Sequence, residues 1–194
     1  MIAIENNNLE DLIFNQNELV YATHTHAPCV AKFEKVPYVQ FKEDVLNLNI
    51  TQDQNRIEKE YDAIKLPKRS TAGSAGYDFV LPHAVTLRPD RGIVVPTGIR
   101  ARIMSGWMLK LYPRSGTGFK YGVEFYNTTP IIDSDYYFAK NTGHIMLKLT
   151  VKEGIHTFEA GERICQGIFE QFGLAIGDDA TDIRTGGLGS TGKK

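Results

Sequence analysis

The chain has 194 residues, of which 42% are hydrophobic and 23% are charged, and this is the composition of an ordinary globular protein. The formal net charge of −1 excludes a general attraction to nucleic acid or to a membrane surface, so an anion would have to be bound by a local site. The N-terminal sequence lacks the basic and apolar regions of a signal peptide, and no stretch is long and apolar enough to span a membrane. We therefore expect a cytoplasmic protein.

Residues 1–57 are rich in Asn and Gln and differ in composition from the rest of the chain. We expect an appended arm that packs on a neighbouring subunit. Its pattern allows at most a short helix, with Phe41, Val45 and Leu48 on one side, and predicts a linker over residues 49–57.

The possible metal ligands of this arm are too few to predict a metal site. His24, His26 and Cys29 lie close together in the sequence, but a tetrahedral zinc site needs a fourth ligand. The second cysteine, Cys165, lies in an apolar run, which is typical of a small buried residue rather than of half a disulfide.

From about Ile64 onward the sequence has the pattern of β-strands. Apolar and polar residues alternate in "GIRARI" (98–103), "WMLKLYP" (107–113) and "HIMLKLTV" (144–151), as expected for strands with one buried face. Gly and Pro separate these segments at short intervals, and no helical pattern longer than two turns follows residue 64. The sequence therefore predicts an all-β sandwich or barrel.

Two glycine-containing segments have more polar groups than a turn requires. In "GSAGYDF" (73–79) small residues allow close approach of the backbone and Asp78 can accept hydrogen bonds, although an ordinary Gly/Asp turn would look the same. In "PRSGTGFKYG" (113–122) the guanidinium of Arg114, the hydroxyl of Ser115 and the amides beside the glycines could bind a phosphate. A hairpin loop with an exposed Arg is the alternative.

A third segment, "NTTPIIDSDYYF" (127–138), places two carboxylates beside an aromatic ring. On an extended backbone Asp133 and Asp135 would point the same way, and Tyr136 follows directly. A carboxylate next to a flat ring could hold a nucleophilic water beside a sugar. Solvated acids in a turn are the alternative.

The fourth segment, "GERICQGIF" (161–169), has Gln166 on the same strand face as Ile164 and Ile168. A polar side chain on an apolar face needs a hydrogen-bond partner, which could be either structural or a ligand. The chain then ends in the glycine-rich stretch 184–194, which cannot be ordered by burial alone and could close over a bound ligand.

Taken in order, these motifs resemble the homotrimeric dUTPases, the deoxyuridine triphosphate nucleotidohydrolases. The motifs are AGYD (75–78), PRSG (113–116), IDSDY (132–136), GERICQ (161–166) and GGLGSTG (186–192). The resemblance covers roughly residues 64–192. It implies a jelly-roll-like β-barrel of the dUTPase type over residues 58–183, a mobile lid over 184–194, and a homotrimer with active sites at the subunit interfaces.

The resemblance also implies the reaction and its residues. The family hydrolyses dUTP to dUMP and pyrophosphate, which limits uracil in DNA and supplies dUMP for thymidylate synthesis. Asp133 would activate the water that attacks the α-phosphorus, and Mg²⁺ would arrive with the triphosphate without direct protein ligands. Asp78, Asp135 and Arg163 would support the site.

Each substrate-binding residue has an implied partner. Ser115, Gly116 and Gln166 would contact phosphate oxygens alongside Arg114, and Arg184 would reach the γ-phosphate. Asn127 would pair with uracil and Tyr136 would stack under the deoxyribose, leaving no room for a 2′-hydroxyl. The remaining predicted contacts are Ile132, Leu188, Gly189, Ser190 and Thr191.

The sequence departs from the family pattern at three places. Leu188 stands where the lid usually has Phe, Pro130 stands where Gly is usual, and "YFAKNT" (137–142) lengthens the hairpin after Tyr136. Two alternative functions stay open: a dCTP deaminase of the same fold, and a regulatory dUTP-binding protein that acts through a protein partner.

Overall fold

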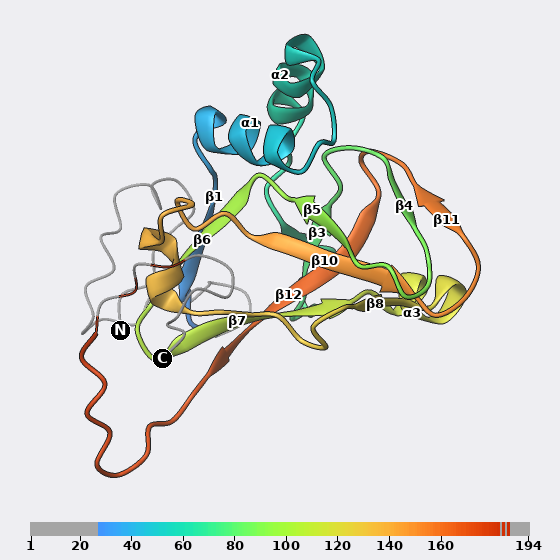
Figure 1. The fold of residues 1–194 in the computed structure, drawn as a ribbon. Helices are drawn as coiled ribbons and strands as arrows, with labels where there is room; N and C mark the ends of the chain where they lie inside the picture. Colours follow the sequence, from blue (N-terminus) through green and yellow to red (C-terminus); the bar gives the residue numbers. More distant parts are fainter. Residues whose placement is uncertain (1–26, 183, 185, 187–194) are drawn as a thin grey trace.

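The structure is a computed structural model that describes residues 27–182, 184 and 186 (Figure 1). Strands predominate and surround one hydrophobic core. The strands are β1 (Ala31–Lys35), β2 (Lys68–Arg69), β3 (Tyr77–Val80), β4 (Val85–Leu87), β5 (Ile93–Pro96), β6 (Ile99–Ile103), β7 (Trp107–Pro113), β8 (Val123–Phe125), β9 (Ile131–Ile132), β10 (Met146–Val151), β11 (His156–Phe158) and β12 (Arg163–Gln171). The helices are α1 (Tyr38–Asn47), α2 (Gln54–Asp62), α3 (Ser115–Tyr121) and the 3₁₀ helix η2 (Ser134–Phe138).

The strands form small antiparallel sheets. The largest has the order β2-β3-β12-β7-β9, a second has the order β5-β10-β8, and the pairs β1-β6 and β11-β4 complete the described strands. Long β12 lies between β3 and β7, so residues of three sequence motifs meet on neighbouring strands. The expected all-β architecture is confirmed.

The alternation in the sequence identified the buried strand faces. In β6, Ile99, Ala101 and Ile103 are buried, and in β7 Leu109 and Leu111 are completely buried. These side chains point inward at every second position, which is why the two-residue period is visible in the sequence.

The predicted linker over 49–57 agrees with the structure only for residues 49–53, which form no helix or strand. Helix α2 begins at Gln54, and the Asp53 side chain caps it by accepting hydrogen bonds from the backbone N–H groups of Asn55 (3.0 Å) and Arg56 (3.2 Å). Ile57 is completely buried. The Asp53 cap and the buried Ile57 stabilise a helix in spite of the polar composition of this segment. The boundary expected between arm and barrel at residue 57 therefore falls inside a helix.

The part of the N-terminal region that the structure describes before α2, from residue 27 onward, also packs on the barrel. β1 pairs with β6 along its whole length, and α1 buries Phe41 and Val45 as expected, whereas Leu48 lies just beyond the helix and is 36% exposed. Figure 1 shows α1 and α2 side by side at one end of the barrel. Val36, Phe41 and Ile57 belong to the same hydrophobic core as the strands.

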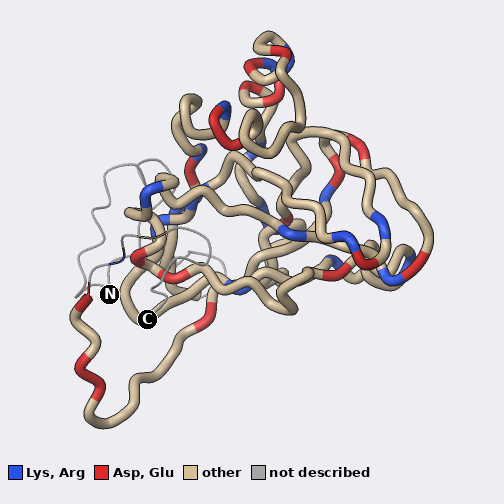
Figure 2. Tube along the Cα trace, in the orientation of Figure 1, with Lys and Arg blue, Asp and Glu red and all other residues tan. Residues whose placement is uncertain are grey.

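Acidic and basic residues are interspersed over the barrel, as Figure 2 shows. Within the part of the chain that the structure describes, no helix has the length and apolarity needed to cross a membrane. Cys165 is buried and unpaired, as predicted, and burial raises the pKa of its thiol.

Candidate functional site

Asp78 is the centre of a charged cluster. It lies in β3 and is 9% exposed, and its carboxylate accepts hydrogen bonds from Arg114 Nε (2.8 Å), Arg163 Nη1 (3.0 Å) and Ser70 Oγ (2.8 Å). Both oxygens are therefore satisfied, and the two cations compensate a carboxylate that would be costly to bury alone. Asp78 orients Arg114, and it lies in strand β3 rather than in a turn.

Gln166 lies beside this cluster. In β12 it is opposite Asp78 on one side and Tyr112 on the other, and its Nε2 donates to the Pro113 carbonyl at 3.4 Å. A Cβ atom on Gly76 would overlap the Gln166 amide, so a larger residue at this position would displace the Gln166 side chain. The close backbone approach expected around residues 73–79 is confirmed.

The PRSG segment forms a short helix rather than a hairpin loop. Ser115 and Gly116 open α3, and Gly122 ends it in the left-handed region at a φ of 62°. The Thr117 hydroxyl lies within hydrogen-bond distance of the carbonyls of Arg114 (3.1 Å) and Ile164 (3.2 Å), which ties the helix to β12. The glycines thus serve a helical turn and its C-cap, which a loop prediction from composition could not show.

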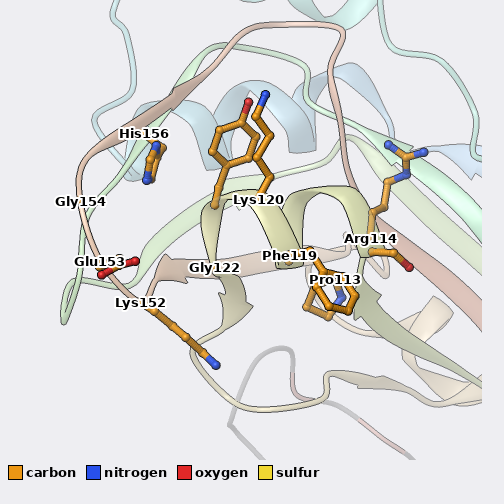
Figure 3. Close-up of a pocket in the computed structure, with 12 residues that line it drawn as sticks. Pro113, Arg114, Phe119, Lys120, Gly122, Lys152, Glu153, Gly154 and His156 are labelled. Atoms are coloured by element: carbon orange, nitrogen blue, oxygen red, sulfur yellow. The ribbon is translucent and has the colours of Figure 1, made fainter.

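A cavity of about 880 Å³ lies along α3, as Figure 3 shows. Arg114 and Ser115 line one part of it, and Lys120, Lys152 and His156 line another. Phe119 also faces this space and is 95% exposed. Several cationic side chains around an open cavity suit an anionic ligand.

A second polar cluster forms at the other predicted motif. Arg184 Nη2 lies 2.5 Å from Asp133 Oδ2, and Arg184 Nε lies 2.7 Å from Asp135 Oδ1. The guanidinium is also 5.9 Å from the ring centre of Tyr136. The structure therefore brings together four predicted site residues from positions about fifty residues apart.

The backbone of this cluster is extended at Asp133, as expected, but not at Asp135. Asp133 is the residue before η2, and Asp135 lies within that 3₁₀ helix. The carboxylates still converge on one guanidinium because a planar fork can bind two acceptors at once. About half of each carboxylate side chain is exposed, so both are accessible to water and to a ligand.

The Tyr136 side chain is buried and its hydroxyl is held by two hydrogen bonds. It is 6% exposed, its hydroxyl donates to the His144 carbonyl at 2.9 Å, and it accepts from Asn141 Nδ2 at 2.8 Å. Burial raises the pKa of the Tyr136 phenol. The two hydrogen bonds and the surrounding core fix the ring, and only a small part of the side chain is exposed for a ligand to contact.

Two further predicted contacts differ in exposure. Asn127 is exposed in the turn between β8 and β9. Ile132 is only 8% exposed and pairs with Leu109, so its side chain belongs mainly to the core. Leu188, Gly189, Ser190 and Thr191 lie outside the described residues, as do His24 and His26.

The two clusters are far apart within one chain. Arg114 precedes α3, whereas Asp133 and Tyr136 lie at η2, and these helices are at opposite ends of the barrel in Figure 1. Within a single chain, the predicted phosphate-binding residue Arg114 and the predicted water-activating residue Asp133 therefore lie at separate places.

Three residues that the sequence analysis missed lie behind Tyr136. They are Asp44, Asn141 and His144, and His144 is completely buried. One signal was visible: Asp44 lies between Phe41 and Val45 on the apolar side of α1, where a carboxylate needs a partner. Among residues 27–182, 184 and 186, no three His, Cys, Asp or Glu side chains gather in a way that could hold a metal ion.

Comparison with known proteins identifies the family. The family model described as dUTPase matches residues 62–192. The deoxyuridine 5′-triphosphate nucleotidohydrolase of Lactococcus lactis subsp. lactis is 40% identical over 135 residues, which cover 66% of this chain and 89% of that protein. The protein of the same name from Finegoldia magna is 35% identical, over 66% of this chain and 91% of the relative.

The fold agrees with a solved member of the family. The crystal structure of dUTPase from Streptococcus mutans superposes with a TM-score of 0.53 and 32% identity, over 74% of this chain and 97% of that one. The resemblance of the five motifs is thus confirmed by independent matches of sequence and structure. This chain belongs to the dUTPase family.

Proposed function

We propose that this protein hydrolyses dUTP to dUMP and pyrophosphate. The observation that carries the proposal is that Asp133, Tyr136 and Arg184 lie together, which places a half-exposed carboxylate beside a flat ring and a guanidinium. Relatives that are 40% and 35% identical bear the name deoxyuridine 5′-triphosphate nucleotidohydrolase.

In the proposed reaction Asp133 orients one water molecule and accepts its proton while the water oxygen attacks the α-phosphorus. The bond between that phosphorus and the bridging oxygen breaks, and pyrophosphate leaves. The half-exposed carboxylate can reach a bound water without further rearrangement of the backbone. The Tyr136 ring would lie under the deoxyribose and exclude a 2′-hydroxyl, and Asn127 would pair with uracil.

The phosphate chain would be bound by Arg114, Ser115, Gly116 and Gln166, with Arg184 at the γ-phosphate. Arg114 suits this role because Asp78 already fixes its guanidinium. Mg²⁺ prefers oxygen ligands and retains water, and the accessible carboxylates of Asp133 and Asp135 fit a hydrated ion carried by the triphosphate. When bound, the ion would neutralise phosphate charge.

We further propose that the active protein is a homotrimer with sites shared between subunits. The separation of Arg114 from Asp133 within one chain supports this, because a single substrate could contact both groups only if a second chain supplied one of them. The cytoplasmic location expected from the sequence stays a prediction, as do the roles of Leu188, Gly189, Ser190 and Thr191.

The first test measures pyrophosphate release with Mg²⁺ from dUTP, dCTP, dTTP and UTP. We expect turnover of dUTP alone, and its loss in Asp133→Asn, which keeps the shape of the side chain but cannot accept the proton. A dCTP deaminase would release ammonia from dCTP and leave the triphosphate intact, so ammonia release from dCTP would favour that alternative. Tight binding of dUTP without turnover would contradict the proposal and favour a regulatory role.

A second test mixes two inactive variants. Asp133→Asn and Arg114→Ala are unfolded together and refolded as mixed trimers. If each site takes these residues from different chains, about a quarter of the sites in an equal mixture contain both native groups, and activity returns. Mixtures that stay inactive would show that one chain supplies both residues, contrary to the proposed shared site.

A further inference from the structure

The side chain of His144 connects the N-terminal helix α1 to the barrel. The backbone N–H of Gly98 donates to His144 Nε2 at 2.7 Å. Because an N–H group can only donate, Nε2 must be the acceptor, and the ring proton is therefore on Nδ1. Nδ1 lies 2.6 Å from Asp44 Oδ2, so it donates to that carboxylate.

The backbone of the same histidine supports Tyr136. The His144 carbonyl accepts from the Tyr136 hydroxyl at 2.9 Å and from Asn141 Nδ2 at 3.2 Å. The His144 N–H in turn donates to the Asn141 carbonyl at 3.0 Å. A continuous chain of hydrogen bonds therefore runs from Asp44 through His144 to Tyr136.

This connection has little freedom to move. His144 is completely buried, and the Asp44 side chain is 14% exposed. Phe41, one turn before Asp44, is completely buried and its ring centre is 6.2 Å from that of His144. Asp44 Oδ2 also accepts from Gln40 Nε2 at 3.0 Å, which fixes the carboxylate on the helix.

The residue that follows Tyr136 is attached to the N-terminal region independently. Tyr137 donates from its hydroxyl to Glu34 Oε2 at 2.7 Å, and Arg100 lies 4.5 Å from the Tyr137 ring centre. Arg100 Nη2 is also 2.9 Å from Glu34 Oε2. The insertion after Tyr136 therefore packs against β1 and β6 rather than standing free.

We propose that Asp44 is a positioning residue for the nucleotide site: acting through His144, it fixes the height and tilt of the Tyr136 ring that discriminates deoxyribose from ribose. This rests on the proposed function, since it assigns Tyr136 to the sugar. The family match begins at residue 62, so the N-terminal helix that carries Asp44 lies outside the matched region. In this proposal, helix α1 of the segment that the sequence analysis predicted to be an appended arm contributes to substrate specificity.

The test compares three variants of α1 for kcat and KM with dUTP and UTP. Asp44→Leu has a similar size but no acceptor, so it leaves the buried Nδ1–H unpaired, and we expect roughly a tenfold loss of the preference for dUTP over UTP in kcat/KM. Asp44→Asn keeps an acceptor oxygen and should retain most of the preference. Glu43→Leu, at an exposed position of the same helix, should behave as the wild type.

A purely structural role for Asp44 would lower the melting temperature of Asp44→Leu without changing the dUTP-to-UTP ratio, and that result would overturn the proposal. Nitrogen NMR of the wild-type histidine rings gives a test that needs no variant to fold. The proton of His144 must be on Nδ1, and a proton on Nε2 would also overturn the proposal.

Failure of the positioning role can be distinguished from failure of the proposed function. If the wild-type protein hydrolyses no dUTP, the proposed function fails, and the Tyr136 ring signals then decide the positioning role. They should shift or broaden in Asp44→Leu and stay in place in Glu43→Leu. Ring signals that are unchanged in Asp44→Leu would show that Asp44 does not hold Tyr136.

Discussion

His83 is expected to make the protein less stable below neutral pH. It is 4% exposed, and its Nδ1 lies 3.8 Å from Glu60 Oε2 on α2, too far for a hydrogen bond. Burial, with a smaller contribution from the positive charge of Arg56, lowers the pKa of His83 from 6.5 to about 4. The native protein therefore holds this ring neutral under conditions where the unfolded chain protonates it.

The sign and size of the effect follow from this difference. Because the unfolded state binds the extra proton, the stabilisation is complete above pH 6.5 and is lost as the pH falls toward about 4. A difference of this size corresponds to about 3 kcal/mol over the whole range. Between neutral pH and pH 5, the free energy of unfolding should fall by about 2 kcal/mol through this group alone.

Urea denaturation at a series of pH values, at one fixed protein concentration, measures the effect. His83→Gln removes the titrating ring, so its stability should fall less with pH than that of the wild type. His156→Gln is the matched control, because His156 is only partly buried, and its curve should parallel the wild type. Parallel curves for His83→Gln and the wild type would refute the reasoning.

Three further substitutions test the two clusters. Asp78→Ala should lower the free energy of unfolding by about 2 kcal/mol in urea denaturation, because two cations lose their shared carboxylate; unchanged stability would contradict the role of the cluster. Arg184→Lys cannot bind two acceptors at once, and kcat/KM for dUTP should fall about tenfold in steady-state kinetics, whereas wild-type kinetics would exclude a bidentate role. Gly76→Ala should cost about 1–3 kcal/mol by displacing Gln166, while Gly73→Ala, whose added Cβ meets no atom within 4 Å, should be neutral; equal melting temperatures would show that the site can adapt.

The sequence predicted those parts of the fold that depend on local periodicity. The inward side chains of β6 and β7 follow a strict period of two, and the motifs around Asp78 and Asp133 have fixed spacing, so both were visible without coordinates. Helix α2 was not predicted, because its Asn- and Gln-rich sequence resembles a linker and only Asp53 and Ile57 distinguish it.

Long-range pairings were hidden for a different reason. Asp44 and His144 are 100 residues apart, and neither local sequence indicates that the two side chains are hydrogen-bond partners. The extended backbone expected at Asp135 was also wrong, because this residue lies in η2, which is stabilised by its own short-range backbone hydrogen bonds rather than by a neighbouring strand. Local patterns show that a polar residue needs a partner, but only the assembled fold shows which partner it has.

The contact of Arg184 with Asp133 and Asp135 has a consequence for the kind of nucleotide that can react. The guanidinium is paired with one of the two oxygens of the carboxylate that the proposed reaction uses as a base. In that reaction a γ-phosphate would replace the carboxylates as the anion that Arg184 binds, and both oxygens of Asp133 would then be free to orient water. A nucleoside diphosphate has no third phosphate to offer, so Arg184 would stay paired with Asp133 and keep one oxygen from water. The ion pair would therefore favour triphosphates over diphosphates.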